Sequence, residues 1–375
     1  MGAMNKDIIK LNEDILPAVY ASSNYGVHGC GKKNYRKQLS FLVAADVHGD
    51  TERMKAAISY MNRIDSLDFG IHLGDMQPGN FVENDGSWYV NTILAAEKPF
   101  YTVIGNHDGG NSKVHSISAT SEQVFDKFIR PLKKQMSIPN LDKTYYSVNF
   151  DTFKVSLIVL DDYNQPEGRD ENGDFLFSRG SAVISEEQLN WFIQTLQEIP
   201  EDYHLLIARH AFPEESIVTE CPWSQPGQVM ATINPGYGHQ DMITAVVDAW
   251  MNGQMLKTQI KPAADYPNLP ILNIEIDYSK RGKGNFVGYF TGHMHCDVIG
   301  ISKTFTRQNV FSFASACSDD WQNAGCDLPR TEGTRQQDCL TVCSIDTENR
   351  LVKFVRVGSN ITVNLTERKY WVVKY

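Results

Sequence analysis

The pattern that decides the fold first occurs at residues 39–50, LSFLVAADVHGD, where a short apolar run ends in acidic and imidazole side chains. The same order returns at residues 69–75, FGIHLGD, and at residues 100–108, FYTVIGNHD. Between these runs, residues 51–64 carry apolar side chains at helical spacing, and residues 89–96 are also predicted to be helical. Strand, polar loop and helix therefore alternate, which is typical of a layered α/β fold with ligands beyond the carboxyl ends of its strands.

The remaining pattern predicts more helices and a second sheet packed on the first. Residues 121–129 are predicted to be helical, and the Ser185–Gln188 capping box begins another amphipathic helix. Strands are predicted at residues 145–150, 155–160, 205–208 and 287–290, and the later run expected to form the second sheet lies near residues 298–303, 309–315, 340–345 and 351–357. Two connections, residues 162–180 and 211–284, are too long for simple loops and are predicted to form a rim over a site.

Composition excludes several classes of protein. The chain has 375 residues, 42% hydrophobic and 21% charged, with a net charge of −10 from 35 basic and 45 acidic residues. This is globular composition, without the ~18-residue apolar run of a membrane helix. The acidic balance disfavours an extended nucleic-acid surface. We expect an N-terminal arm at residues 1–37, one main domain at 38–357 that includes the 211–284 insert, and a C-terminal extension at 358–375.

The seven cysteines indicate neither a zinc ribbon nor a thioredoxin motif, because no Cys-x-x-Cys pair occurs. We expect most of them to be small buried side chains, with one disulfide in the Cys317–Cys343 group as the alternative for an exported protein. The first residues carry no apolar signal region, which predicts a cytoplasmic protein. An exported form with a trimmed leader stays open, because Gly2-Ala3 before a second Met resembles a cloning remnant.

Metal-binding side chains gather at the predicted strand ends. The carboxyl ends of neighbouring strands meet at one edge of a sheet, so these side chains are expected to converge. Histidine with carboxylate is a ligand mixture for zinc, manganese or iron, and one carboxylate can bridge two metals. The residues in question are Asp46, His48, Asp75, Asn106, His107, Asp108, His210, His293 and His295.

Five motifs in order resemble the calcineurin-like metallophosphoesterase family. They are Asp46-x-His48, Gly74-Asp75, Gly105-Asn106-His107-Asp108, a lone His210 after a strand, and Gly292-His293-x-His295. The resemblance covers roughly residues 39–345, and the segment 346–358 is similar to a terminal hairpin of bacterial and phage-related members. It implies a four-layer α/β/β/α sandwich in which helices flank two packed mixed sheets and a dinuclear metal site lies at the strand ends.

The resemblance also implies a role for each motif residue. Asp46, His48 and His295 would hold the first metal, Asn106, His210 and His293 the second, and Asp75 would bridge both; Mn²⁺, Fe or Zn²⁺ are the expected ions. A metal-bridging hydroxide would attack phosphorus in line. His107 would face the phosphate as general acid or stabiliser, oriented by Asp108. Pro78 departs from the family's Gly-Asp-x-x-Asp pattern, which removes an orienting acid but no ligand.

Several side chains have a structural alternative beside the functional one. Arg209, next to His210, is the best candidate for binding a phosphate oxygen, and a structural ion pair is its alternative. Asp161-Asp162 follows a strand and either approaches the metals or caps a turn. His72 is expected to be a core histidine, and the acidic segment 170–174 is expected to be a solvated loop rather than a calcium site.

The leading hypothesis is a metal-dependent phosphoric ester hydrolase, a phosphatase or a phosphodiesterase. The pattern does not separate monoesters from diesters, because both reactions use the same ligands. The long inserts favour a small phosphate ester as substrate, and no protein partner is indicated. The alternatives are a non-catalytic scaffold or binding protein on the same fold, which would be expected to lose ligands, and a nuclease acting on nucleic-acid ends, which would need a basic groove.

Overall fold

The computed structural model describes most of the chain from Gln38 to Tyr375. Outside the described residues lie 1–37, 80, 82–84, 111–118, 139, 165–167, 170, 173–181, 214–215, 221–241, 264–268, 303–306, 318–329, 335, 360, 364–365 and 369. The expected arm at residues 1–37, most of the 162–180 connection and all of the acidic segment 170–174 except residues 171 and 172 therefore fall outside them.

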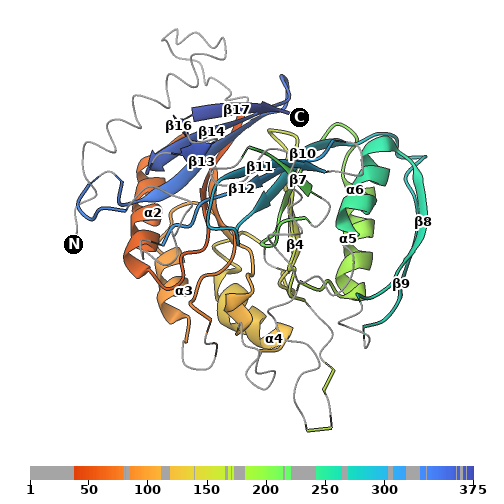
Figure 1. Ribbon diagram of the computed structural model, residues 1–375, viewed down its shortest axis with the longest axis horizontal. Helices are drawn as coiled ribbons and strands as arrows, with labels where there is room; N and C mark the ends of the chain where they lie inside the picture. The colour runs from red at the N-terminus through yellow and green to blue at the C-terminus, as the bar shows by residue number, and fades with distance from the viewer. Residues whose placement is uncertain are drawn as a thin grey trace.

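The first sheet has six strands and contains the strand that leads into the motif at residues 39–50 (Figure 1). Its order is β17 (Tyr370–Lys374), β14 (Leu351–Gly358), β13 (Cys339–Asp346), β1 (Gln38–Ala44), β2 (Phe69–His72) and β3 (Phe100–Thr102). The strands β1, β2 and β3 are parallel, whereas β13 pairs with β1 antiparallel. The three motif-bearing strands therefore end at the same edge.

The second sheet has seven strands. Its order is β4 (Tyr146–Phe150), β5 (Val155–Val159), β6 (His204–Ala208), β10 (Asn285–Thr291), β12 (Asn309–Ser312), β11 (Val298–Ser302) and β7 (Ser216–Glu220). The strands β5, β6, β10 and β12 are parallel. The expectation that the late strands share one sheet was wrong. The strands β11 and β12 join this sheet, and β13 and β14 join the first, because β13 finds its partner in β1.

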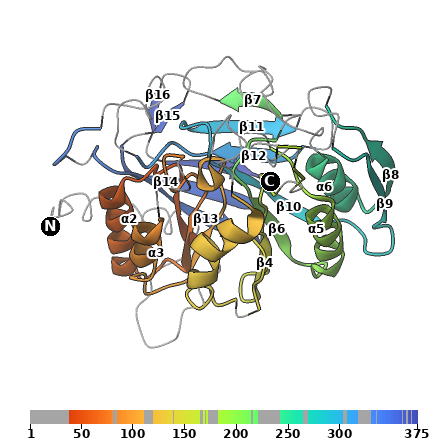
Figure 2. The ribbon, with the colours of Figure 1, turned by 90° about the horizontal axis from the view of Figure 1, so that it is seen from below.

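Helices cover the outer face of each sheet, so the molecule has the expected four α/β/β/α layers (Figure 2). The helices α2 (Thr51–Arg63) and α3 (Ser87–Ile93) lie over the first sheet, and α5 (Glu186–Glu198) and α6 (Ile243–Asn252) lie over the second. Side-chain caps begin α2 at Asp50 and α5 at Ser185. The helix expected at 121–129 is α4 (Ser121–Val124) followed by a π-helical turn at Phe125–Ile129.

The described parts of the insert at residues 211–284 form regular elements that had not been predicted. Besides β7 and α6 it contains the hairpin of β8 (Met255–Ile260) and β9 (Leu272–Asp277), which packs with α6. Trp250 of α6 is fully buried, and its indole N–H donates to the Leu196 carbonyl of α5 at 2.9 Å. Near the chain end, β15 (Ile361–Val363) pairs with β16 (Thr366–Arg368) and β17 extends the first sheet. The division into arm, domain and extension stays a prediction.

Aromatic side chains join the two sheets. Phe41 of β1 lies 5.7 Å from Phe290 of β10, and Phe311 of β12 lies 4.9 Å from Phe354 of β14, measured between ring centroids. All four rings are buried. Such contacts fix the spacing of the sheets and so hold the two sets of strand ends next to each other.

Candidate metal centre

The expected ligands converge where the two sheets meet. One ligand atom from each of Asp46, His48, Asp75 and His295 forms a first group, whose atoms all lie within 4.8 Å of one another. Asp75, His210 and His293 form a second group by the same measure. Asn106 belongs beside the second group, because its Oδ1 lies 3.1 Å from His210 Nε2 and 3.0 Å from His293 Nδ1. Asp75 is the member that the two groups share.

The first group brings four motif residues from three strand ends together. His48 Nε2 lies 3.1 Å from His295 Nε2 and 3.7 Å from Asp75 Oδ2. His295 Nε2 lies 3.5 Å from Asp46 Oδ1. The backbone N–H of His293 donates to both oxygens of Asp46, at 2.9 and 3.1 Å, and this ties the loop after β10 to the loop after β1.

The second group is oriented by a backbone carbonyl. His210 Nδ1 lies 2.7 Å from the Leu73 carbonyl oxygen, which can only accept, so Nδ1 carries the proton. The lone pair of neutral His210 is then on Nε2, which lies 3.2 Å from Asp75 Oδ2. Proteins commonly fix a metal-binding imidazole in this way. The donor set and this orientation both fit a metal ion.

Strained backbone is concentrated at these residues. Among the described residues other than glycine, eight have positive φ, and five of them are Asp46 (51°), His48 (43°), Asp75 (57°), His293 (68°) and His295 (53°). Left-handed backbone costs a residue with a Cβ about 1–2 kcal/mol. Strain of this kind persists where the surrounding structure over-determines the conformation, and it gathers at functional sites.

The glycines before two of the motifs make room for the ligands. A Cβ on Gly74, which has φ +94°, would lie 2.4 Å from His210 Nδ1. A Cβ on Gly105 would lie 2.3 Å from Asp75 Oδ1. Neither distance is possible for real atoms, so the Gly-Asp and Gly-Asn-His-Asp motifs need glycine for close approach.

Burial and mutual charge set the protonation of the cluster. Burial lowers the pKa of His48 and of His293 to about 3 and raises that of Asp46 to about 6. Burial also works to lower the pKa of His210, but the adjacent Asp75 carboxylate outweighs it and raises this pKa to about 10. His48 and His293 are therefore neutral at pH 7 with a lone pair to share, whereas a metal ion at His210 would displace a proton.

His107 lies at the open side of the cluster, with 21% of its side chain exposed. Its Nε2 lies 3.9 Å from Asp75 Oδ2, and its backbone N–H donates to Asp75 Oδ1 at 2.8 Å. Its Nδ1 lies 3.0 Å from the Pro78 carbonyl oxygen, so it is the donor. Pro78, which stands where the resemblance would place an orienting acid, thus orients His107 through its backbone carbonyl. A backbone contact of this kind cannot be predicted from the residue type.

The Asp108 carboxylate makes its hydrogen bonds to backbone N–H groups, and its expected orientation of His107 stays a prediction. Its buried carboxylate accepts four backbone N–H groups: Oδ2 those of Gly105 at 2.8 Å and Asp75 at 3.0 Å, and Oδ1 those of Met76 at 2.7 Å and Gln77 at 3.3 Å. Burial and then the nearby Asp75 carboxylate raise the pKa of Asp108, and the hydrogen bonds from the Gly105 and Met76 N–H groups only partly offset this. Because all four contacts are donors, the carboxylate holds the loop that carries Asp75.

Arg209 forms the structural ion pair that was its alternative. Only 1% of the residue is exposed, and its Nε and Nη2 lie 2.9 and 2.7 Å from Asp162 Oδ1. Asp161 and Asp162 are both fully buried, and Asp161 accepts the Thr144 hydroxyl at 2.7 Å. These contacts favour the structural interpretation of all three residues. His72 is buried against the ring of Tyr89, as expected of a core histidine.

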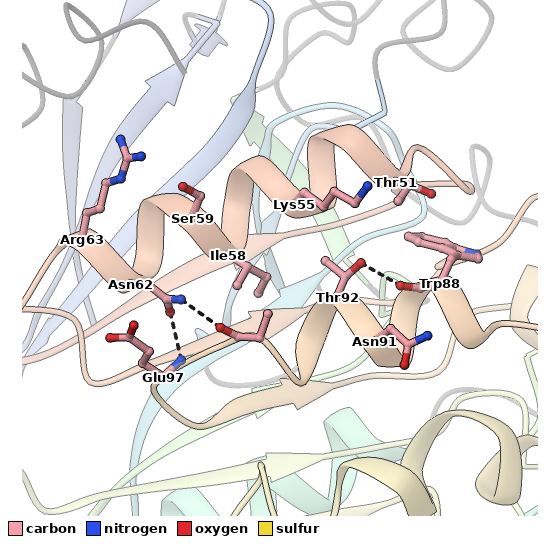
Figure 3. Close-up of a pocket in the computed structure, with 11 residues that line it drawn as sticks. Thr51, Lys55, Ile58, Ser59, Asn62, Arg63, Trp88, Asn91, Thr92 and Glu97 are labelled. Atoms are coloured by element: carbon pink, nitrogen blue, oxygen red, sulfur yellow. Dashed lines mark hydrogen bonds between the residues drawn. The ribbon is translucent and has the colours of Figure 1, made fainter. Parts of the chain in front are cut away.

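A groove of about 700 Å³ lies elsewhere, between α2 and α3 (Figure 3). Lys55 and Arg63 of α2 and Trp88 and Asn91 of α3 are among its lining residues, and none of the seven expected ligands is. Asn62 crosses it, with hydrogen bonds to the Ala95 carbonyl and the Glu97 N–H at 2.9 and 3.0 Å. The groove is thus separate from the cluster.

Comparisons with known proteins give a family match and similar solved structures. Residues 39–248 match the family described as calcineurin-like phosphoesterase. A structure of PhoD aligns over 90% of this chain and 70% of its own, with 14% identity and a TM-score of 0.46. A purple acid phosphatase from yellow lupin (Lupinus luteus) aligns over 90% of this chain and 54% of its own, with 9% identity and a TM-score of 0.45. No curated protein matches the chain.

The fold and the site together define a metal-dependent phosphoester hydrolase. The chain belongs to the calcineurin-like phosphoesterase family, since the match covers more than half of it. Members typically bind two metal ions, and the two Asp/His groups could hold metal. None of the helices in the described part of the chain is both long and apolar enough to cross a membrane.

Proposed function

We propose that the protein hydrolyses a small phosphate monoester or diester with two metal ions. The observation that carries this proposal is that the two ligand groups share the Asp75 carboxylate. The first metal would be held by Asp46, His48 and His295, and the second by Asn106, His210 and His293. Manganese, iron and zinc all suit this mixture of imidazole and carboxylate.

The metal pair would supply a nucleophile from water at neutral pH and polarise a phosphoryl oxygen. The chain's own residues do the rest. Asp108 and the Leu73 carbonyl hold Asp75 and His210 in place. His107 lies at the open side with Nδ1 donating to the Pro78 carbonyl, so its Nε2 is the atom that would exchange a proton with the substrate.

The test compares nitrophenyl phosphate with bis-nitrophenyl phosphate as substrates of the full chain, with Mn²⁺ and after chelation. Turnover that Mn²⁺ restores and a chelator abolishes supports the proposal. The preferred ester then decides between phosphatase and phosphodiesterase. The absence of turnover with two bound Mn²⁺ would favour the scaffold alternative, which would then call for a search for protein partners.

Two variants test the assigned roles. Asp75→Asn should lose both metal ions together, because one carboxylate serves both, and metal analysis after gel filtration checks this. His107→Ala should keep both ions and lower turnover by about 10²–10⁴-fold, the range for a general acid. Loss of metal from the His107→Ala protein would contradict its assignment, because its role does not include binding a metal.

A further inference from the structure

Two arginines are buried among the elements that carry the ligands. Among the described arginines, Arg209 and Arg356 are the most buried, each 1% exposed. Each pairs with an aspartate that is itself at most 2% exposed, Asp162 for Arg209 and Asp297 for Arg356. A buried ion pair adds little net stability on average, because removing both charges from water offsets their attraction. The placement of the pairs therefore calls for another explanation.

The Asp162–Arg209 pair lies directly beside His210 in the chain. The Asp162 carboxylate binds the Arg209 side chain through Oδ1 and accepts the Ala211 backbone N–H through Oδ2 at 2.7 Å. It thus binds the residue before His210 and the residue after it. The ring of the next residue, Tyr163, lies 5.9 Å from the His210 ring. This carboxylate therefore contacts the residues on both sides of His210, whose own Nδ1 lies 2.7 Å from the Leu73 carbonyl oxygen.

Asp162 is itself held rigidly. Its carbonyl accepts the Val183 N–H at 2.7 Å. The side-chain amide of Gln188 in α5 binds both the N–H and the carbonyl of Asp161, each at 2.8 Å. Polar contacts thus continue from α5 to His210 without reaching the ligand atoms themselves.

The Asp297–Arg356 pair does the same for the other loop. Asp297 lies two residues after His295, and its Oδ1 accepts the Ala314 N–H at 3.2 Å. Its Oδ2 accepts a hydrogen bond from Arg356, which lies on β14 of the first sheet and also donates to Cys339 Sγ. The loop after β10 of the second sheet is thereby tied to the first sheet, next to His295, a ligand of the first group only.

We propose that the two buried ion pairs are positioning anchors, one for each metal: Asp162–Arg209 holds His210 for the second ion, and Asp297–Arg356 holds His295 for the first. This inference rests on the proposed two-metal function. None of these four residues is a metal ligand, yet each pair would affect the affinity for one of the two ions.

The test is calorimetric titration of the metal-free full chain with Mn²⁺, comparing Asp162→Asn with Asp297→Asn. Asparagine keeps the size and an acceptor for the backbone N–H but removes the charge, so each variant is the matched control for the other. We expect Asp162→Asn to lower the affinity for the second ion by about 10–100-fold and to leave the affinity for the first unchanged. Asp297→Asn should have the reverse effect.

Ligand variants identify which ion is affected. Asp162→Asn should weaken Mn²⁺ binding no further in a His210→Ala protein, but should weaken it in a His295→Ala protein. If each variant lowered the affinity for both ions equally, or lowered neither, the inference would be overturned. A general loss of structure would affect both ions alike. If an aspartate variant does not fold, Arg209→Lys and Arg356→Lys keep the charge without the planar fork and should show the same selectivity at reduced size. A wild-type chain that binds fewer than two Mn²⁺ would instead refute the proposed function.

Discussion

Replacing Asp108 by Asn should destabilise the protein far more than a buried Asp→Asn exchange usually does. The four backbone N–H groups that the carboxylate accepts are divided two and two between its oxygens. In either orientation the amide presents its NH₂ group to two of them, so two buried donors lose their acceptor. At about 1–3 kcal/mol for each unsatisfied donor, the free energy of unfolding should fall by about 2–6 kcal/mol. Urea unfolding of the metal-free protein measures this loss.

Asp161→Asn is the matched control, because this residue is equally buried and loses the same charge. The Asp161 carboxylate accepts the Tyr163 N–H at 2.9 Å and the Thr144 hydroxyl at 2.7 Å. A hydroxyl also accepts, so an amide satisfies both contacts. Equal loss of stability in the two variants would refute the reasoning. Unchanged stability with slower turnover in Asp108→Asn would restore the role first expected from the sequence, that of orienting His107.

Two further predictions concern strain and pH. His295 has φ +53°, so the His295→Gly variant of the metal-free protein should be more stable than the His295→Ala variant by roughly 0.5–1 kcal/mol. This difference is the strain that a Cβ causes at this φ, less the greater conformational freedom of glycine in the unfolded chain. Urea midpoints compare the two variants, and a more stable Ala variant would contradict the strain. Burial lowers the pKa of His204 to about 4, so protonation favours the unfolded chain, whose histidine titrates near ~6.5. The contribution of neutral His204 to stability is complete above pH ~6.5 and is lost as the pH falls toward about 4. The urea midpoint of His204→Gln should therefore drop less between pH 7 and pH 5 than that of the wild type, and equal drops would exclude this linkage.

The predicted elements were closest to the structure where the pattern is local. The helix Glu186–Glu198 begins at the expected Ser185 cap, because capping depends on residues within one turn, and the helix expected at residues 51–64 spans Thr51–Arg63. The helix and the hairpin within the insert were not predicted. The run Ile243–Asn252 is a helix whose apolar face packs against α5, a contact between elements about 45 residues apart in the chain.

The sequence by itself determined the layered α/β class, the family and the residues expected as ligands. These depend on side-chain chemistry and on short spacings at strand ends, which the residue order records directly. Only the tertiary structure decided that Asp108 holds the Asp75 loop, that Arg209 pairs with Asp162, and which sheet each late strand joins. These partners are backbone N–H groups, a carboxylate 47 residues away and strands far along the chain. Every residue except proline has a backbone N–H, and charge pairing allows many partners, so three-dimensional packing makes the choice.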